Sequence, residues 1–360
     1  MSGPTRSNAG RSTAGHSGAS HSGPSHSNAG PDSALDSLVA GVLAAKPRAI
    51  ARAISAVEAG RDERDELLRR LDAARESARE PTHDAGAPPK IIGLTGPPGA
   101  GKSTLISALV DTVRESGERV AVLAVDPSSP FSGGALLGDR LRMTRHAGDT
   151  GVFIRSMATR GSGGGLSAAT LEAASVLGAA GFGTILLESV GVGQSEVGIM
   201  AVADMVAVVL NPGTGDEIQT LKAGVMEIGD FYVINKADLA GAEELERAVR
   251  RANLVAPGTD LPPVILPVVA TDGTGVPELY RAMSDRIAAL EAAGDLSERR
   301  RRRISGALEQ MAGDLFRQWI RNEGLVNGTK QIPFAEVRRR LSDLLDSLST
   351  TLEDHEGGPE

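Results

Sequence analysis

The apolar residues in the middle of the chain form short continuous runs, separated by helical or Gly-rich stretches. Strands that are apolar on both faces must be buried on both faces, which is typical of a parallel sheet covered by helices. The pattern therefore predicts an α/β fold with a mainly parallel sheet wound by helices. The predicted strands are Ile91–Thr95, Val120–Val125, Val152–Ser156, Thr184–Leu187, Met205–Leu210, Tyr232–Ile234 and Val264–Val269.

Apolar residues at intervals of three and four predict helices between these strands and at both ends of the chain. Between strands, the predicted helices are Ser103–Glu115, Leu166–Ala180, Asp216–Ile228 and Ala242–Ala252. Three apolar stripes precede the sheet: Leu35, Leu38, Val39 and Val42; Ile50, Ile54 and Val57; Leu67, Leu68 and Leu71.

Beyond about Val276 the chain is predicted to be helical almost to its end. Its apolar stripes are Leu279, Met283 and Ile287, then Leu308, Met311, Leu315 and Trp319, then Val337, Leu341, Leu344, Leu345 and Leu348. Because these helices lie outside the sheet, their apolar faces need a packing partner, and we expect a homodimer interface. The five arginines Arg299–Arg303 are expected to form a solvated helix face.

Composition sets the broad class. The 360 residues are 41% hydrophobic and 23% charged, as in an ordinary globular protein, and 2% aromatic, so the core must rest on aliphatic residues. The absence of cysteine excludes disulfides, thiolate metal sites and cysteine nucleophiles, and suits a cytoplasmic protein. The net charge of -8 gives no reason to expect nucleic acid. No apolar run approaches the roughly 20 residues of a membrane span, and no secretory signal pattern is present.

The first chemical motif follows the first predicted strand and begins a helix. Its pattern is G-x-x-x-x-G-K-[ST], in which the glycines turn backbone N–H groups towards phosphates and the helix dipole adds positive charge. We expect Lys102 to bridge the β- and γ-phosphates and the Ser103 hydroxyl to ligate Mg²⁺. The predicted phosphate-binding residues are Gly96, Pro97, Pro98, Gly99, Ala100, Gly101, Lys102, Ser103 and Thr104.

Acidic residues follow two of the other predicted strands. Asp126 ends the second strand and Glu188 the fourth, where a carboxylate can hold Mg²⁺ directly or through water. Gly191 follows at the spacing of a γ-phosphate sensor. Ras-like GTPases place a water-orienting glutamine directly after this glycine, but Val192 stands here and Gln194 comes two residues later. We therefore predict slow hydrolysis by the isolated chain, accelerated by a partner or by Arg142.

The third motif is Asn235-Lys236-Ala237-Asp238, which ends the sixth predicted strand. We expect Asp238 to accept hydrogen bonds from guanine N1–H and its exocyclic amine, and Lys236 to cover the ring. Sites built on such bonds discriminate strongly against ligands that leave the polar groups unpaired. Val269, Ala270 and Thr271 are the predicted backbone rim of the base site. The three motifs, in this order, predict a P-loop NTPase fold that binds GTP and GDP.

These residues resemble a known family. The stretches GPPGAGKST, DPSSPFSGGALLGDRLRM, IRSMATRGSGGGLS, ESVGVGQSE, PGTGDEIQ and INKADL look like the MeaB/ArgK group of G3E-class P-loop GTPases. The glutamate of ESVG, where most GTPases carry aspartate, marks that class. Two positions depart from the family pattern: Gly163 stands where relatives usually have leucine, and Val269 replaces the serine of the base rim.

The resemblance implies a GTPase metallochaperone for an adenosylcobalamin-dependent acyl-CoA mutase, typically methylmalonyl-CoA mutase, with adenosylcobalamin reached only through that client. It also implies a homodimer formed through the C-terminal helices. By the same resemblance, Ser103, Asp126, Asp139 and Glu188 form the magnesium site. By residue type alone Asp139 and Arg142 are equally compatible with surface charges; the resemblance makes Arg142 a switch arginine. The implied catalytic set is Lys102, Arg142, Glu188, Gly191 and Gln194.

The expected organisation has five parts. Residues 1–33 form a disordered tail in which His16, His21 and His26 are solvated; 34–87 form a helical segment and linker; 88–278 form the G domain; 279–352 form a helical dimerisation segment; and 353–360 form a second tail.

Three alternative functions stay open. A nickel-insertion GTPase lacks support because no cysteine or dense histidine cluster is present. An ATP-dependent transport-associated kinase conflicts with Asp238, and a nucleotide-gated scaffold would hydrolyse negligibly.

Overall fold

A seven-stranded parallel sheet organises the protein. The computed structural model describes residues 31–60, 63–77, 88–127, 144–146, 148–159, 165–189, 199, 201–213, 228–252, 262–322, 335–336 and 338–339. The strand order is β3-β2-β4-β1-β5-β6-β7, and every pair is parallel, which confirms the predicted fold class. The strands are β1 Lys90–Thr95, β2 Val120–Pro127, β3 Val152–Thr159, β4 Thr184–Ser189, β5 Met205–Leu210, β6 Phe231–Asn235 and β7 Val264–Val268.

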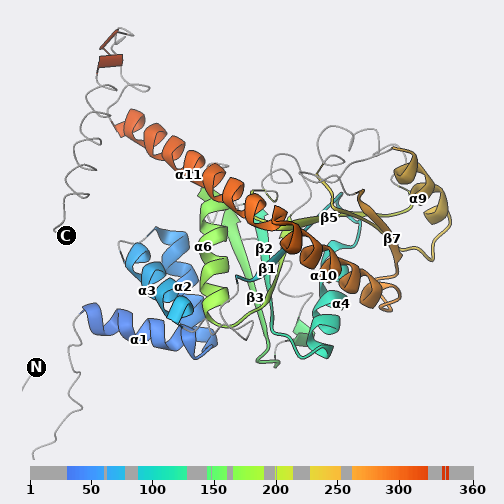
Figure 1. Cartoon of the computed structure of the whole chain (residues 1–360), viewed down its shortest axis with the longest axis horizontal. Helices are drawn as coiled ribbons and strands as arrows, with labels where there is room; N and C mark the ends of the chain where they lie inside the picture. Colours follow the sequence, from blue (N-terminus) through green and yellow to red (C-terminus); the bar gives the residue numbers. More distant parts are fainter. Residues whose placement is uncertain are drawn as a thin grey trace, which may run out of the picture.

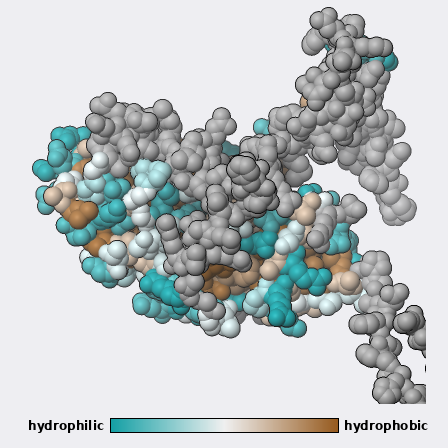
Figure 2. Space-filling view, turned by 180° about the vertical axis from the view of Figure 1, so that it is seen from behind, coloured by the Kyte–Doolittle hydropathy of each residue, from teal (hydrophilic) through white to brown (hydrophobic). Residues whose placement is uncertain are grey.

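Helices cover both faces of the sheet (Figure 1). The helical elements are α1 Pro31–Leu43, α2 Pro47–Ala59, α3 Arg64–Ser77, α4 Lys102–Glu115, η1 Thr144–His146, α6 Gly165–Ala179, α9 Ala242–Arg251, α10 Val276–Ala293 and α11 Asp295–Asn322. One face packs on α4 and α10, and the other on α6 and the N-terminal helices. No helix in the described ranges is both long and apolar enough to cross a membrane. Seen from behind, the described surface carries separate hydrophobic areas among hydrophilic ones (Figure 2).

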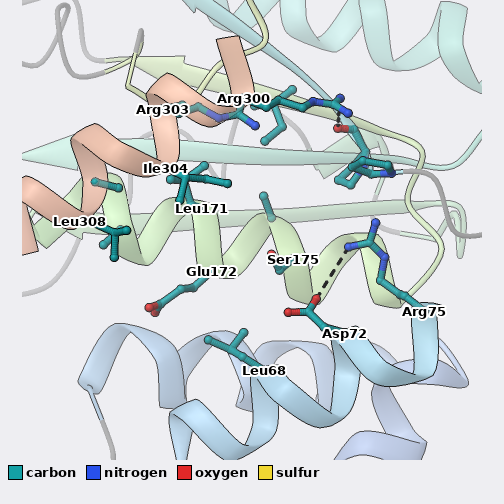
Figure 3. Close-up of a pocket in the computed structure, with 16 residues that line it drawn as sticks. Leu68, Asp72, Arg75, Leu171, Glu172, Ser175, Arg300, Arg303, Ile304 and Leu308 are labelled. Atoms are coloured by element: carbon teal, nitrogen blue, oxygen red, sulfur yellow. Dashed lines mark hydrogen bonds and ion pairs between the residues drawn. The ribbon is translucent and has the colours of Figure 1, made fainter. Parts of the chain in front are cut away.

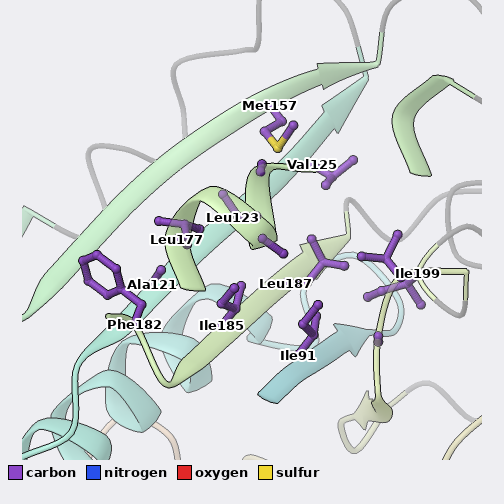
Figure 4. Close-up of a cluster of buried hydrophobic side chains, with 14 of the residues drawn as sticks. Ile91, Ala121, Leu123, Val125, Met157, Leu177, Phe182, Ile185, Leu187 and Ile199 are labelled. Atoms are coloured by element: carbon purple, nitrogen blue, oxygen red, sulfur yellow. The ribbon is translucent and has the colours of Figure 1, made fainter. Parts of the chain in front are cut away.

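Alternate residues of each strand enter two different cores, as the continuous apolar runs require. On β2, Ala121, Leu123 and Val125 face the α6 side, whereas Val120 and Val122 face α4. Figure 4 shows the α6-side cluster gathered between that helix and the central strands. Burial on both faces is consistent with helices covering each side of the sheet.

The N-terminal helices form a layer on α6. Most residues of their three predicted stripes are buried, whereas Leu35, Val39 and Leu68 are partly buried against the same core. Pro47 begins α2 at the position where proline is best tolerated. Arg155 on β3 reaches this layer: it pairs with Glu58 and donates to the Ala51 carbonyl at 3.1 Å. The layer is thereby tied to the sheet by polar as well as apolar contacts.

Two expectations about the C-terminal helices are wrong. The stripe Leu279, Met283 and Ile287 is not part of a homodimer interface, because these residues are buried within the same chain against α4 and the sheet. Nor is the whole arginine run solvated. Arg301 and Arg302 are exposed and pair with Glu298, but the other three arginines point into the protein, as described next.

The three partly buried arginines clamp α11 to the amino-terminal edge of the sheet. Asp204 and Asp230 directly precede β5 and β6, and both are buried. Arg300 and Arg303 each approach Asp204 within 2.9 Å, and Arg299 lies 2.9 Å from Asp230. Helical periodicity explains the split, because positions 299, 300 and 303 share one face of a helix. The predicted helix Asp216–Ile228, except Ile228, lies outside the described residues, as do residues 1–30 and 340–360.

Candidate functional site

The sequence motifs meet at a cavity of about 500 Å³ on the carboxyl edge of the sheet. This edge is where parallel α/β proteins bind ligands, because the loops that follow the strands converge there. The lining residues are Pro98, Gly99, Gly101, Lys102, Ser103, Thr104, Val125, Glu188, Ser189 and Lys236. The loop after β1, the carboxyl ends of β2 and β4, and the loop after β6 thus contribute to one site.

Two glycines of the first motif are required by the backbone. Gly96 has φ of +137°, and a Cβ there would lie 2.1 Å from the Val209 carbonyl oxygen. Gly101 has φ of +91°, and a Cβ there would lie 2.3 Å from the Asn235 side-chain nitrogen. A side chain at either position would be strained and would collide. The loop therefore passes close to β5 and β6 before α4 begins at Lys102.

Lys102 and Ser103, the first residues of α4, are both buried at the cavity. The Lys102 Nζ donates to the Gly96 carbonyl at 2.8 Å and to the Pro97 carbonyl at 3.1 Å, so the cation is held over the loop. The Ser103 Oγ donates to Glu188 Oε1 at 2.6 Å. The structure therefore joins the first and second motifs directly, across 85 positions of sequence.

The paired oxygens of Ser103 and Glu188 suit a hard divalent cation. A hydroxyl and a carboxylate are the ligand types that Mg²⁺ takes beside nucleotide phosphates. The backbone of Asp126 lies close by: it is two residues beyond Ala124, whose register partner on β4 is Glu188. The donor set therefore fits a magnesium ion. The fourth predicted metal residue, Asp139, lies outside the described residues.

Asn235 organises the other side of the cavity. Its Nδ2 donates to the Ala100 carbonyl at 2.8 Å, and its Oδ1 accepts from the N–H groups of Lys236 at 2.8 Å and Ala270 at 3.1 Å. One buried amide thus holds three loops together. The sequence motif predicted a role for Asn235, but it did not predict the contacts of Asn235 with the phosphate loop and the rim.

Lys236 lines the cavity, and the predicted guanine-reading residue Asp238 follows two residues later. Lys236 adopts φ of 56°, uncommon for a residue with a Cβ, and its Nζ donates to the Gly99 carbonyl at 2.9 Å. Its side chain consequently extends over the phosphate loop. The side chain of Asp238, on the same loop, is exposed to solvent. The predicted rim is adjacent, since Ala237 N–H donates to the Val268 carbonyl and Val269 bridges to Thr274.

Ser189 is a cavity residue that sequence reasoning missed. Its Oγ donates to Thr95 Oγ1 at 2.9 Å and joins the ends of β4 and β1. Nothing but its place after Glu188 signals this contact. The predicted residues Arg142, Gly191 and Gln194 lie outside the described residues, so their positions stay predictions.

A second polar cluster, also not foreseen, ties η1 to the flank of α4. The buried His146 Nε2 lies 3.1 Å from the Ser107 Oγ, and its Nδ1 lies 3.7 Å from Asp111. Burial lowers the pKa of His146, with Asp111 opposing the shift. Three residues on, Asp149 accepts from Arg114 at 2.8 Å, which lowers the pKa of that carboxyl. The helix that begins at Lys102 is thereby braced along one side.

Comparison with known proteins agrees with this site. The family described as methylmalonyl Co-A mutase-associated GTPase MeaB matches residues 50–323. A protein of Pyrococcus abyssi named as a GTPase is 42% identical over 86% of this chain and 91% of its own length. The mouse methylmalonic aciduria type A homolog is 35% identical over 74% of this chain and 66% of its own. A LAO/AO transport system kinase superposes with a TM-score of 0.64 at 25% identity, covering 88% of this chain and 98% of that one.

Proposed function

This chain belongs to the MeaB family of GTPases, and from that membership we propose that it is a metallochaperone for an adenosylcobalamin-dependent acyl-CoA mutase. GTP binding and hydrolysis would gate loading of the cofactor onto the mutase and protect the loaded enzyme. The proposal rests on one observation above others. The residues that the MeaB family model spans include all three nucleotide motifs, and the structure gathers them around one cavity. Methylmalonyl-CoA mutase or a close relative is the proposed client.

The proposed chemistry is attack of water on the γ-phosphate, which breaks the bond to the β-phosphate oxygen and releases GDP and phosphate. Backbone N–H groups of the phosphate loop and the Lys102 ammonium would stabilise the charge on the transferred group. Ser103 and Glu188, with Asp126 and Asp139, would hold Mg²⁺, which neutralises phosphate charge when bound. Asp238 would select guanine.

Slow hydrolysis by the chain alone is part of the proposal. Val192 occupies the position at which a glutamine orients the attacking water in faster GTPases. Positioning of that water would therefore fall to Gln194, Gly191 and the switch arginine Arg142. A bound mutase that orders those residues would raise the rate. Whether the chain holds GTP or GDP would then depend on whether the mutase is bound.

We further propose a cytoplasmic homodimer in which residues 88–278 form the G domain and the later helices supply the dimer contacts. The exposed apolar residues Ile304, Leu308 and Phe316 on α11 support this. Monomeric behaviour in light scattering at micromolar concentration would contradict it.

Protection of the mutase is the direct test of function. Methylmalonyl-CoA mutase loaded with adenosylcobalamin should lose activity during turnover more slowly when this chain and GTP are present. The matched control is Lys102→Ala, which removes the cation held over the phosphate loop and should abolish protection. An identical decay with wild type, with Lys102→Ala and without either protein would refute the chaperone proposal.

A further inference from the structure

The carboxyl end of β4 is held by a side-chain hydrogen bond on each face of the sheet. Successive side chains of a strand point to opposite faces, so Glu188 and Ser189 face opposite sides. The Glu188 Oε1 accepts from the Ser103 Oγ of α4 at 2.6 Å. Ser189 shares the α6 side with Leu187, and its Oγ donates to the Thr95 Oγ1 of β1 at 2.9 Å. Two consecutive residues thus fasten the strand end to two different elements.

The bond between Ser189 and Thr95 lies where the register of β1 with β4 ends. The last register pair of these strands is Leu94 with Glu188. One residue farther along both strands the two hydroxyl side chains meet, with Thr95 0% and Ser189 3% exposed. A hydrogen bond that water cannot reach is strengthened by the low local dielectric. Because Gly96 follows Thr95, this bond connects the start of the phosphate loop to the residue after Glu188.

Apolar packing borders this bond on the α6 side. Gly93 lies two residues before Thr95, on the same face of β1, and a Cβ added to it would lie 2.8 Å from the Ile199 Cγ1. Ile199 is buried in the same cluster as Leu187, and Figure 4 shows both residues there. Aliphatic side chains offer no replacement hydrogen bond, so loss of either hydroxyl would break this connection between the strand ends.

A fixed backbone at Glu188 matters for the proposed magnesium site. Mg²⁺ requires oxygen ligands at about 2.0–2.1 Å in nearly octahedral geometry, so small displacements of a ligand weaken its binding. Groups that orient a ligand from behind contribute to metal affinity although they do not touch the metal. Ser189 has this relation to Glu188, because its hydroxyl faces the other side of the sheet and its effect would pass through the backbone of β4.

The phosphate loop has other supports, so the effect should be specific to the metal. The Lys102 Nζ donates to the Gly96 carbonyl at 2.8 Å and to the Pro97 carbonyl at 3.1 Å. The Asn235 Nδ2 donates to the Ala100 carbonyl at 2.8 Å. None of these three bonds involves β4. Binding of nucleotide without Mg²⁺ should therefore depend little on how the end of β4 is held.

We propose that Ser189 is a positioning residue for magnesium. Its hydrogen bond to Thr95 fixes the end of β4, which holds the Glu188 carboxylate where it and the Ser103 hydroxyl can bind the same ion. The inference rests on the proposed magnesium site of this GTPase and is independent of any client mutase. It assigns a role to a residue that the E-x-x-G pattern leaves unspecified.

Mg²⁺ titration with a fluorescent, non-hydrolysable GTP analogue measures metal binding without turnover. The Mg²⁺ concentration that half-maximally slows release of the analogue from the full-length chain reports the affinity of the site for the ion. We expect Ser189→Ala to raise this midpoint about tenfold, as for other lost groups that orient a metal ligand. Affinity for the analogue in excess EDTA should stay within about twofold, which also shows that the variant is folded.

Variants of Thr95 separate the hydrogen bond from packing. Thr95→Val removes the hydroxyl with nearly the same shape and should raise the Mg²⁺ midpoint as much as Ser189→Ala does, whereas Thr95→Ser keeps the hydroxyl and should stay near wild type. The double variant Ser189→Ala/Thr95→Val should have the midpoint of either single, because both changes remove one bond. Its stability in urea should partly recover, since no unpaired hydroxyl is left. A midpoint that recovers together with stability would overturn the positioning role.

Two matched changes lie at the amino edge of the sheet. Thr184→Val removes a buried hydroxyl from the other end of β4, where the Thr184 Oγ1 donates to the Glu118 Oε2 at 3.3 Å. Ser175→Ala removes a hydroxyl from a groove of about 420 Å³ between α3, α6 and α11, which Pro89 and Ile91 border (Figure 3). Neither position lines the nucleotide cavity, so both variants should keep the wild-type Mg²⁺ midpoint whatever their stability.

The outcomes separate this inference from the metal site itself. Raised midpoints in Ser189→Ala and Thr95→Val, with Thr95→Ser and both matched changes at the wild-type value, support positioning. Ser103→Ala removes a proposed ligand and should raise the midpoint at least as far. A raised midpoint in Ser103→Ala but not in Ser189→Ala would overturn the role of Ser189 and leave the magnesium site standing. Unchanged midpoints in both would refute the site as well.

Discussion

Single residues shape the cavity in which we propose that the nucleotide binds. Asn235 fixes three loops through its buried amide, and Lys236 extends over the phosphate loop from a left-handed backbone conformation. Asp238 lies two residues beyond Lys236, which lines the cavity, and its side chain is exposed. The chemistry of that one carboxylate, an acceptor for two guanine donors, is what separates a GTPase from an ATP-dependent kinase on the same fold.

Asp238→Asn should change the nucleotide preference from GTP to XTP. An amide presents a donor where guanine also donates, whereas xanthine offers a carbonyl at that position. We expect GTP affinity to fall by at least about a hundredfold, as for other lost hydrogen-bond pairs in buried sites, and XTP affinity to rise. Titration of GTP, XTP and ATP measures this. Asp285→Asn, an exposed change on α10, is the control; tight ATP binding by the wild type would contradict the assignment.

How much of the site the sequence could show depends on the kind of contact. The phosphate loop and the asparagine motif follow from residue types at fixed spacing, so both were predictable. The 2.6 Å hydrogen bond from Ser103 to Glu188 and the Ser189–Thr95 contact depend on which strands are neighbours. Strand order is not written in local patterns. The cluster of Ser107, His146 and Asp111 was missed for the same reason.

At the scale of elements, α11 shows how one sequence run serves two purposes. Arg299–Arg303 look uniform in sequence, yet the helix turns three arginines inward to buried aspartates and two outward to Glu298. A charge count could not show the difference, because the aspartates are about 70 to 100 positions away in the chain. The inward group fastens the C-terminal helix to the starts of β5 and β6.

Arg300→Ala should destabilise the protein by about 3 kcal/mol, because it leaves the buried Asp204 carboxylate with too little positive charge. Arg301, one position away, has a side chain that is 71% exposed, so Arg301→Ala should change stability by less than about 1 kcal/mol. Urea unfolding of both variants measures the contrast. Equal losses would mean that Arg300 is no more than a surface cation.

The η1 anchor on α4 predicts a pH dependence. Burial lowers the His146 pKa below its usual 6.5, so the unfolded chain takes up the proton first as pH falls. The stability that neutral His146 contributes is therefore complete above pH 6.5 and is lost below it, towards the folded-state pKa.

Melting temperatures of wild type and His146→Gln should reveal this anchor. The glutamine is neutral at every pH and keeps a hydrogen-bonding group near Ser107. On going from about pH 7.5 to 5.5, the wild type should lose several degrees more than the variant. The carboxylates Asp111 and Asp149 are common to both proteins and cancel in the comparison. Parallel curves would show that His146 is already exposed to solvent.

In the whole molecule, different features lie at the carboxyl and amino edges of the sheet. The carboxyl edge gathers the nucleotide residues, and the amino edge holds α11 and borders the groove between α3, α6 and α11. The sequence foresaw the parallel sheet and its flanking helices because burial on two faces leaves a clear pattern. It placed the α10 stripe wrongly, since a pattern shows that a helix face is buried but not what covers it.

We propose that a cobalamin-dependent mutase controls GTP hydrolysis by this chain. The rate of GTP hydrolysis by the purified chain, alone and with increasing methylmalonyl-CoA mutase, tests this proposal. We predict slow turnover alone and a severalfold, saturable increase with mutase, absent in Lys102→Ala. Turnover of about ten per second or more by the chain alone, or a rate that mutase leaves unchanged, would contradict control by the mutase.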